Sequence, residues 1–445
     1  MVTLAIKVGF VSLGCPKNQI NTEKMISLLV NNGYEIVAED VDAQVIVINT
    51  CAFVESAKQE AIENILDIAW LKDNHTLKGI VVTGCLPERV REEIFTEMPE
   101  VDCILGTGSY NDICEAVEAA YNKKRYKSFK PVDSIELGGE RVITTPDYFA
   151  YLQIAEGCDN CCSYCVIPQI RGRFRSRQMS EVLEEARQLA ELGVKELCLV
   201  AQDTTRYGED IYGTYALDSL ITEISEIKGI EWIRLLYCYP DRITDSLIDV
   251  IAQNDKVVKY IDMPIQHISD RILGAMNRRD TRKSIDAVIK KLRERVPGIV
   301  LRSTVIVGFP GETKEDFNQL REYLKAVKFE RLGVFTYSRE ENTPAYDMPD
   351  QVSETTKRNR FEALMADQRR NHNEFNKSFL GKTLKVICEG YDTVSESFYG
   401  RSYADAPDID GKIYFSSHRR IRDGEFVEVK ITELLDYDLV GRVSE

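Results

Sequence analysis

The first part of the chain alternates short apolar runs with stretches of helical periodicity. Three apolar runs end in a small residue followed by a cysteine: Val8–Cys15, Val45–Cys51 and Ile80–Cys85. Helical patterns follow them at residues 22–32, 56–70 and 87–98. Strands that alternate with helices at this spacing predict a parallel sheet, and the three cysteines would share its carboxyl edge.

A second series of apolar strands begins near residue 148. Six are expected, at Tyr151–Ala155, Glu196–Val200, Trp232–Tyr237, Tyr260–Met263, Val300–Val307 and Leu332–Tyr337. Helical patterns such as Ser180–Leu192 and Lys314–Val327 separate them. A closed barrel of this kind needs eight strands, so six predict an open partial barrel with a site at its carboxyl edge.

The last part of the chain changes character. A polar linker at 338–353 and a long charged helix at 354–378 precede five short strands, which predict a small β-barrel. The fold class is therefore a multidomain α/β protein. The expected domains are an amino-terminal parallel α/β domain at 1–140, the partial barrel at 141–350, a connecting helix at 351–378 and a β domain at 379–445.

Composition fits this organisation. The 445 residues are 44% hydrophobic and 29% charged, as in ordinary globular domains. The start of the sequence resembles no signal peptide, and no apolar run is long enough to span a bilayer, so we expect a cytoplasmic protein without a membrane partner. A net charge of −15 disfavours nucleic-acid binding over the whole surface. The negative charge is compatible with binding to a basic protein partner, and it is equally compatible with a charge that only keeps the protein soluble.

The 12 cysteines are the most informative feature of the sequence. Thiols in a cytosolic protein stay reduced, so clustered cysteines indicate metal or redox chemistry. Cys158, Cys162 and Cys165 form a C-x3-C-x2-C set directly after the first strand of the partial barrel. Three thiolates on one loop can hold three corners of a four-iron cluster and leave the fourth iron open to S-adenosylmethionine (SAM). Structural zinc and a C-x-x-C redox loop are the alternatives, and Cys161 is interpreted as a bystander.

Cys15, Cys51 and Cys85 can hold a second cluster in the same way, since their placement at three equivalent strand ends is improbable by chance. The alternative is that they are small buried hydrophobes. That interpretation is expected for the cysteines that lie inside apolar patterns: Cys103, Cys114, Cys198, Cys238 and Cys388.

The string Glu156–Arg177 resembles the radical SAM methylthiotransferase family. The amino-terminal segment is similar to that family's cluster domain, and the terminal β module resembles its TRAM domain. The resemblance implies two 4Fe-4S clusters and two SAM molecules per turnover. One SAM would methylate a sulfur on the first cluster, and the other would be cleaved at the catalytic cysteines Cys158, Cys162 and Cys165. An electron donor such as flavodoxin or ferredoxin and a sulfur donor are implied as partners.

Candidate SAM contacts follow from strand ends and turns in the partial barrel: Tyr164, Gln202, Asp203, Arg302, Thr304 and Gly308. The alternative for each is a local structural role. His267 is expected to be structural. Four arginines alternate along the chain: Arg171, Arg173, Arg175 and Arg177. On an extended segment they would share one face. That face would be either an anchor for the substrate or for SAM, or a solvated charged surface.

Two sequence features favour a protein substrate. Ser12–Asn18 and Cys51–Ser56 look like the branch that modifies the β-carbon of an aspartate in ribosomal protein S-twelve, free or on the small subunit. The module from Lys377 to Glu445 has ten basic and thirteen acidic residues, which suits a basic partner. Arg419, Arg420 and Arg422 keep open the alternative, a tRNA methylthiotransferase acting on a modified adenosine beside the anticodon. A non-catalytic iron–sulfur scaffold or redox sensor would leave the six-strand domain without a purpose.

Overall fold

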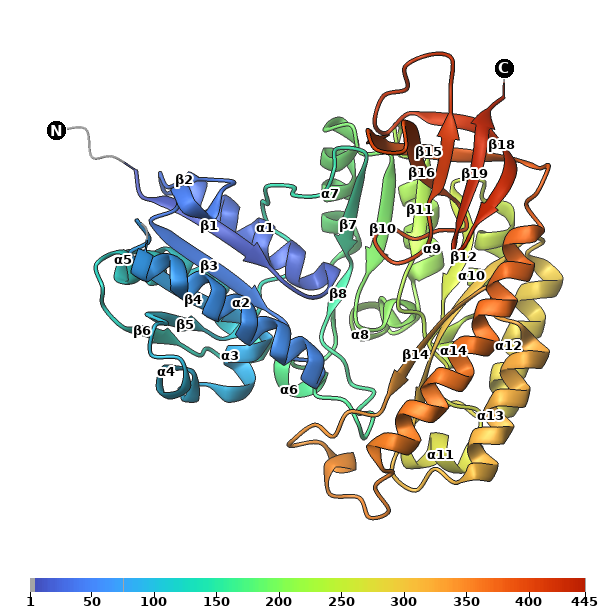
Figure 1. Cartoon of the computed structure of the whole chain (residues 1–445), viewed down its shortest axis with the longest axis horizontal. Helices are drawn as coiled ribbons and strands as arrows, with labels where there is room; N and C mark the ends of the chain where they lie inside the picture. The colour runs from blue at the N-terminus through green and yellow to red at the C-terminus, as the bar shows by residue number, and fades with distance from the viewer. Residues whose placement is uncertain (1–4, 75, 445) are drawn as a thin grey trace.

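The computed structural model describes residues 5–74 and 76–444, and Figure 1 shows three parts along the chain. A parallel α/β part comes first, and an open sheet covered by helices lies at the centre. A small β-barrel packs against residues that begin the central strands, among them Phe149, Trp232 and Val300. The predicted fold class is confirmed.

The described residues of the first part form a six-stranded parallel sheet in the order β2-β1-β3-β4-β5-β6. Strands β3 and β4 are buried along their whole length because apolar clusters cover both faces. The strands are β1 Lys7–Ser12, β2 Glu35–Ile36, β3 Val45–Thr50, β4 Gly79–Gly84, β5 Cys103–Leu105 and β6 Tyr126–Ser128. The helices are α1 Pro16–Asn31, α2 Glu55–Asn74, α3 Cys85–Val90, α4 Glu93–Glu97 and α5 Ile113–Tyr121.

Two helix predictions in this part were wrong in extent. The helix predicted at 87–98 is broken into α3 and α4, because Arg91 has a φ of 50° and turns the chain between them. Helix α1 starts at Pro16 rather than at residue 22, since proline suits the first helical position and Cys15 serves as the N-cap.

The central part is an open six-stranded parallel sheet in the order β14-β13-β12-β11-β10-β7, in which the described edge strands β7 and β14 do not pair with each other. Its strands are β7 Phe149–Gln153, β10 Glu196–Val200, β11 Trp232–Leu235, β12 Val257–Asp262, β13 Val300–Val307 and β14 Arg331–Thr336, with a small ribbon of β8 Ala155–Glu156 and β9 Arg175–Ser176. Its helices are α6 Ile167–Arg171, α7 Met179–Glu191, α8 Glu209–Tyr212, α9 Leu217–Ser225, α10 Asp245–Gln253, α11 Asp270–Ala275, α12 Arg282–Arg295 and α13 Lys314–Val327.

Helix α14, Glu354–Lys377, leads from the central part to the terminal barrel. The described barrel is closed in the order β15-β16-β17-β19-β18. Its strands are β15 Thr383–Asp392, β16 Ser397–Ser402, β17 Ile413–Ser416, β18 Phe426–Leu435 and β19 Asp438–Val443.

A buried ion network ties the barrel to the central sheet. Glu196 at the start of β10 lies between Arg234 of β11 and Arg401 of β16, and each guanidinium is 2.7 Å from one carboxylate oxygen. Arg234 also donates to the carbonyl of Tyr403, at 2.9 Å. The barrel is therefore anchored by charges that water cannot reach.

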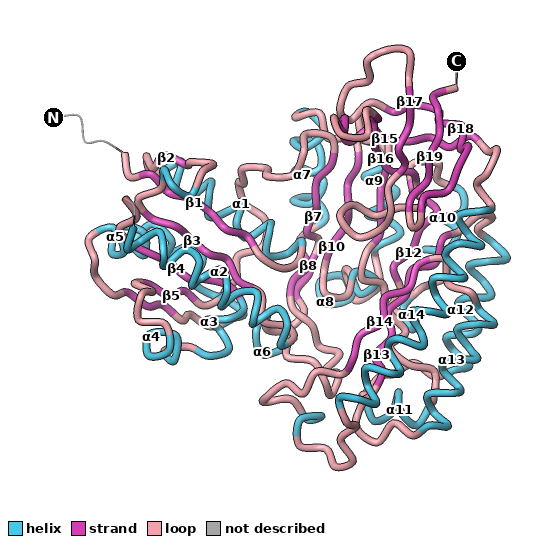
Figure 2. The backbone as a smooth tube through the Cα atoms, viewed as in Figure 1, coloured by secondary structure: helices cyan, strands magenta, loops and turns pink. Residues whose placement is uncertain are grey.

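A loop after β14 ties the first part to the central part, and Figure 2 shows most of this stretch as loop. The carboxylate of Glu340 is 2.7 Å from Arg89 and 3.2 Å from Lys58, both in the first part. Among the described residues, no helix is long and apolar enough to cross a membrane.

Candidate functional site

The loop after β8 carries the first group of thiols. Gly157 begins it with a φ of 78°, and a side chain there would overlap the carbonyl of Arg173. Further along, Ser163 donates its backbone N–H to the carbonyl of Met276 at 3.0 Å, which fixes the loop against the end of α11. The loop therefore has a defined path before any cofactor binds.

Cys158, Cys162 and Cys165 lie near enough to one another on this loop for their charges to interact. Burial raises the pKa of Cys158 to about 12, and charges on Asp203 and Cys162 add to this increase. Burial also raises the pKa of Cys165, with smaller contributions from Cys162 and Cys158. Thiols that are buried together in this way keep their protons until a metal replaces them.

Cys161 lies apart from these three. Its side chain is exposed and its backbone has a φ of 48°. Its carbonyl accepts a hydrogen bond of 2.8 Å from the side-chain amide of Asn277. The residue shapes the turn while its thiol points away from the interior.

The second group of thiols lies at the carboxyl edge of the first sheet. Cys15 follows β1 and caps α1, Cys51 follows β3, and Cys85 is the first residue of α3 after β4. Burial raises the pKa of Cys51 to about 12, and charges on Cys85 and Cys15 would add to this. A side chain at Gly14 would approach the Cβ of Cys51 to 2.6 Å, so only glycine lets these two strand ends come together.

Arg171 connects the two groups. It ends α6, just after the cysteine loop, and its guanidinium lies 3.6 Å from the Sγ of Cys85. It also donates to the side chains of Asn18 and Asn21, the latter at 2.7 Å. The guanidinium is buried, and Glu156 lies 3.7 Å away. Arg171, which belongs to the central part, therefore contacts Cys85, which belongs to the first part.

The four alternating arginines do not share one face, because Arg171 ends helix α6 while the three that follow lie outside the helix and differ in burial. Arg171 and Arg177 are buried, whereas Arg173 is exposed. Arg177 pairs with Glu185 at 2.5 Å. A single solvated face is therefore not correct for this run, and an anchor for substrate or SAM stays a prediction.

Lys17 reaches in the opposite direction, from the first part to the central sheet. Its Nζ lies 3.4 Å from the carbonyl oxygen of Ala201, which follows β10. The same atom lies 3.3 Å from the centre of the Tyr237 ring, which follows β11. Together with Arg171, this contact shows that the carboxyl edges of the two parallel sheets face each other.

The predicted SAM contacts at the second strand end are engaged within the protein. Asp203 is buried, pairs with Arg242 at 2.6 Å and accepts a hydrogen bond of 2.9 Å from Asn160 of the cysteine loop. Gln202 donates to Glu156, and its own Oε1 has no partner among the described residues. Tyr164 packs beside an apolar cluster that includes Phe309.

The remaining candidates lie on or after β13. Arg302 pairs with Asp262 at 2.6 Å, and Thr304 faces the same side of the strand. The N–H of Gly308 donates to Glu312, so this amide is not free to hold adenosine. His267 is buried and accepts a hydrogen bond from the backbone of Ser269, which agrees with a structural role.

Comparisons with known proteins agree with this geometry. Residues 7–106 match the uncharacterized protein family UPF0004, residues 152–324 match the radical SAM superfamily, and residues 380–443 match the TRAM domain. The chain is 47% identical to the ribosomal protein uS12 methylthiotransferase RimO of Thermoanaerobacter sp. (strain X514), over 98% of this chain and 99% of the relative. It is 49% identical to the protein of the same name from Acetivibrio thermocellus, over 98% of each chain.

The chain belongs to the family of ribosomal protein uS12 methylthiotransferases. The family resemblance predicted from the motifs is confirmed. A solved structure of TsrM, a radical SAM methyltransferase from Kitasatospora setae, has the same fold with a TM-score of 0.58, 16% identity and 77% of each chain covered.

Membership of the radical SAM superfamily implies a 4Fe-4S cluster and SAM. The two groups of thiols in this chain have the chemistry that such a cluster needs. Each group offers three free cysteines, the soft ligands that iron–sulfur clusters take. Within the described ranges, no three His, Cys, Asp or Glu side chains are arranged to hold a single metal ion.

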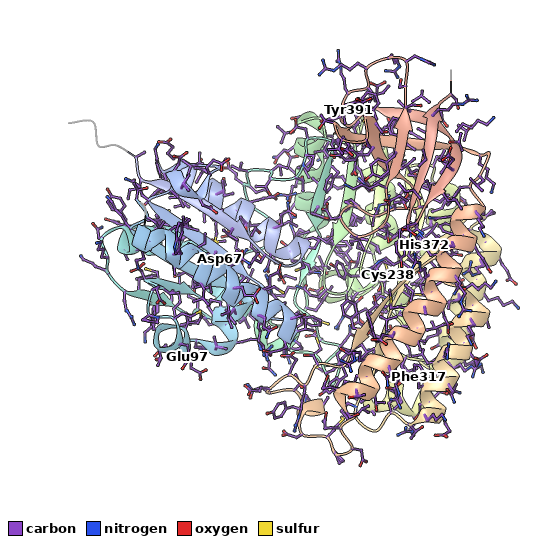
Figure 3. The ribbon with its side chains drawn as sticks, in the orientation of Figure 1. Asp67, Glu97, Cys238, Phe317, His372 and Tyr391 are labelled. Carbon is purple, nitrogen blue, oxygen red and sulfur yellow. The ribbon has the colours of Figure 1, made fainter. Side chains whose placement is uncertain are left out.

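The five cysteines predicted to lie inside apolar patterns are buried or partly buried, and Figure 3 labels one of them, Cys238, in the central part. Cys103, Cys198, Cys238 and Cys388 are fully buried, and Cys114 is partly buried.

Sequence reasoning missed several residues near the thiols of this family member. Tyr239 places its hydroxyl 3.9 Å from the Sγ of Cys162, and Arg278 lies 4.4 Å from the centre of the Tyr239 ring. Tyr239 comes soon after the end of β11, the kind of position that already identified Gln202 and Asp203, whereas Arg278 follows helix α11 and no strand-end signal marks it. Glu156 is the first residue of the motif Glu156–Arg177. Its buried contacts with Gln202 and Arg171 could not be predicted, because they form only where three segments of the chain meet.

Proposed function

We propose that this chain attaches a methylthio group to the β-carbon of an aspartate in ribosomal protein uS12. Two 4Fe-4S clusters would serve this reaction, one on Cys158, Cys162 and Cys165 and one on Cys15, Cys51 and Cys85. The observation that carries the proposal is that both thiol groups lie on carboxyl edges that face each other. A substrate carbon held between the edges would be close to both clusters.

The chemistry explains why two sites are needed. A reduced cluster with SAM on its open iron supplies radical hydrogen abstraction, which an acid or base side chain cannot perform at an unactivated carbon. The protein's own residues hold the geometry: Asp203 and Asn160 brace the cysteine loop, and Arg171 joins that loop to Cys85. Tyr164, Arg302 and Thr304 remain candidates for SAM contacts.

Each predicted domain would have its own role in the reaction. Residues 1–140 would hold the sulfur-bearing cluster, 141–350 the SAM-cleaving cluster, and 379–445 would meet the substrate after the connecting helix at 351–378. The relatives named uS12 methylthiotransferase match over nearly their whole length, which supports uS12 as the substrate. We infer two SAM molecules per turnover, an electron donor such as flavodoxin or ferredoxin, and a cytoplasmic reaction.

The test is the intact mass of uS12 from cells with and without this gene. We expect uS12 to be heavier by the exchange of one hydrogen for one methylthio group only when the gene is present. Fragment mass spectra would then locate the modified aspartate.

An unchanged uS12 mass would contradict the proposal. If a methylthioadenosine were missing from the tRNA of the deleted strain instead, the substrate would be tRNA and the two-cluster chemistry would stand. If purified protein with a reductant did not convert SAM to 5′-deoxyadenosine, the radical step itself would be refuted.

A further inference from the structure

One of the two edge strands of the central sheet is closed by the protein itself. The backbone groups of Phe149, Tyr151 and Gln153 in β7 point away from β10, because Tyr148 and Ile154 bond to that strand and backbone directions alternate. All three outward carbonyls accept a side-chain hydrogen bond, from Thr145 at 2.6 Å, Arg141 at 2.6 Å and Arg177 at 2.7 Å. These three acceptors are therefore already in use.

The opposite edge strand, β14, is open. Tyr337 donates its N–H to the carbonyl of Val307 in β13, at 2.8 Å. By the same alternation, Leu332, Val334 and Thr336 turn their backbone groups away from β13. Among the described residues, none of these N–H and C=O groups takes part in a hydrogen bond. The free edge of β14 therefore offers the donors and acceptors that a further strand needs.

A cavity of about 370 Å³ lies along this free edge. It touches three successive residues of β14: Arg331, Leu332 and Gly333. Successive side chains of a strand point to opposite faces, so a space that reaches all three lies at the edge of the strand. Helix α14 and the terminal barrel form its other walls, with Met365, His372, Ile409 and Tyr437 among the lining residues.

Helix α14 follows β14 and packs against it. In a right-handed unit of strand and helix, the helix lies over the position of the next strand of the sheet. The cavity between β14, α14 and the barrel therefore occupies the place that a seventh strand would take.

The surroundings of this edge suit an extended peptide. Ile409 and Tyr437 line the cavity and are 42% and 47% exposed, and Phe335, further along β14, is 54% exposed. Such apolar surfaces can receive alternate side chains of a bound strand. A side chain at Gly333 would meet its nearest neighbours only at 3.6 Å, an ordinary contact distance, so the fold does not require glycine there. Glycine inside a strand often marks a place where another backbone approaches closely.

We propose that the free edge of β14 binds the segment of uS12 that carries the aspartate, as an extended seventh strand. The inference rests on the proposed function and deepens it, because pairing with a strand edge needs a polypeptide backbone and excludes tRNA. The six residues of β14 lead from the cavity beside the barrel to the carboxyl edge of the sheet, a distance of about 20 Å. A paired segment would therefore run toward the thiols.

This edge fits a single segment better than a second copy of the chain. Helix α14 and the barrel wall the cavity. The edge of another folded sheet would meet these walls before it reached β14, whereas one extended segment can enter lengthwise.

The first test is a scan of backbone N-methylation in a labelled peptide that covers the aspartate of uS12. Each peptide is titrated into wild-type holoenzyme and followed by fluorescence anisotropy. Methylation removes one amide donor and keeps every side chain. We expect methylation at alternate positions to weaken binding roughly tenfold, and methylation at the positions between them to change it little. Each silent position is the matched control for its neighbours.

Thr336→Pro is the corresponding change in the enzyme. Proline removes the outward N–H, which has no bond within the sheet, so the edge strand should tolerate it. Lys127→Pro is the matched control: Lys127 lies in β6, an edge strand of the first sheet, and its N–H also points outward because Tyr126 and Ser128 bond to the other side. We expect Thr336→Pro to bind the peptide roughly tenfold more weakly and Lys127→Pro to bind it as the wild type does.

Hydrogen exchange of the wild-type holoenzyme, resolved by residue, gives a readout that needs no variant. With the peptide bound, the amides of Leu332 and Thr336 should exchange more slowly. The amides of Gly333 and Phe335 face β13 already and should change little.

Uniform effects along the methylation scan would overturn the inference, as would protection of other segments in place of Leu332 and Thr336. Both results leave the proposed function intact. Protection of these two amides in the enzyme alone, lost on dilution, would assign the edge to a second copy of the chain instead. If the wild-type enzyme modified no uS12 but methylthiolated tRNA, the proposed function and the inference would fail together.

Discussion

Replacing Glu196 with glutamine should loosen the terminal barrel from the central sheet. Glutamine keeps the shape of the side chain but removes the charge that Arg234 and Arg401 share, each 2.7 Å from the carboxylate. All three side chains are essentially inaccessible to water. Removing one partner of a buried ion pair costs about 3–5 kcal/mol, because the remaining charges stay buried. We expect a loss of that size for Glu196→Gln.

The tryptophans provide the assay. Trp232 is 4% exposed and packs edge-on against Phe426 of the barrel, with ring centres 4.8 Å apart. Trp70, the other tryptophan of the sequence, is exposed. The change of tryptophan fluorescence in urea therefore reports separation of barrel and sheet. We expect the transition of Glu196→Gln at a lower urea concentration than that of the wild type.

Glu231→Gln is the matched control, since Glu231 pairs across the same interface with Lys385 at 3.2 Å but both side chains are about half exposed. It should cost less than about 1 kcal/mol. Equal transitions for the two variants would refute the reasoning that burial gives the Glu196 network its strength.

The pKa of Glu196 decides the pH range in which the stabilities of the two variants should be compared. Burial alone would raise the pKa of Glu196, but Arg401 and Arg234 hold it below its usual 4.5. A carboxylate with a lowered folded pKa contributes its full stability above the unfolded value and loses it as pH falls through the folded value. Between about pH 6 and 8 the contribution of Glu196 is therefore constant, and measurements there compare only the substitution.

Two further predictions concern the thiol sites. Cys162→Ser should lose about half of the bound iron, whereas Cys161→Ser should keep all of it because its thiol is exposed, and equal iron contents would contradict the assignment. Arg171→Gln should lower iron retention or shift the visible spectrum of the amino-terminal cluster, since its guanidinium lies 3.6 Å from Cys85. Arg173→Gln is the exposed control, and identical spectra for both variants would show that Arg171 is only structural.

Much of the fold is encoded locally. The strands at Glu196–Val200 and Val300–Val307 begin and end where the apolar pattern predicted, because most residues of each strand are apolar and buried in the sheet. The broken helix after Cys85 escaped prediction, since nothing in the periodicity marks the left-handed conformation of Arg91.

The sequence by itself determined which cysteines form the two thiol groups. Cys158, Cys162 and Cys165 lie on one short loop, and Cys15, Cys51 and Cys85 end equivalent strands, so chain connectivity alone places each group together. Only the tertiary structure decided how the two edges face each other. The contacts of Arg171 with Cys85 and of Lys17 with Tyr237 join residues 86 and 220 positions apart. No local pattern carries such pairings, because they depend on how separately folded parts pack.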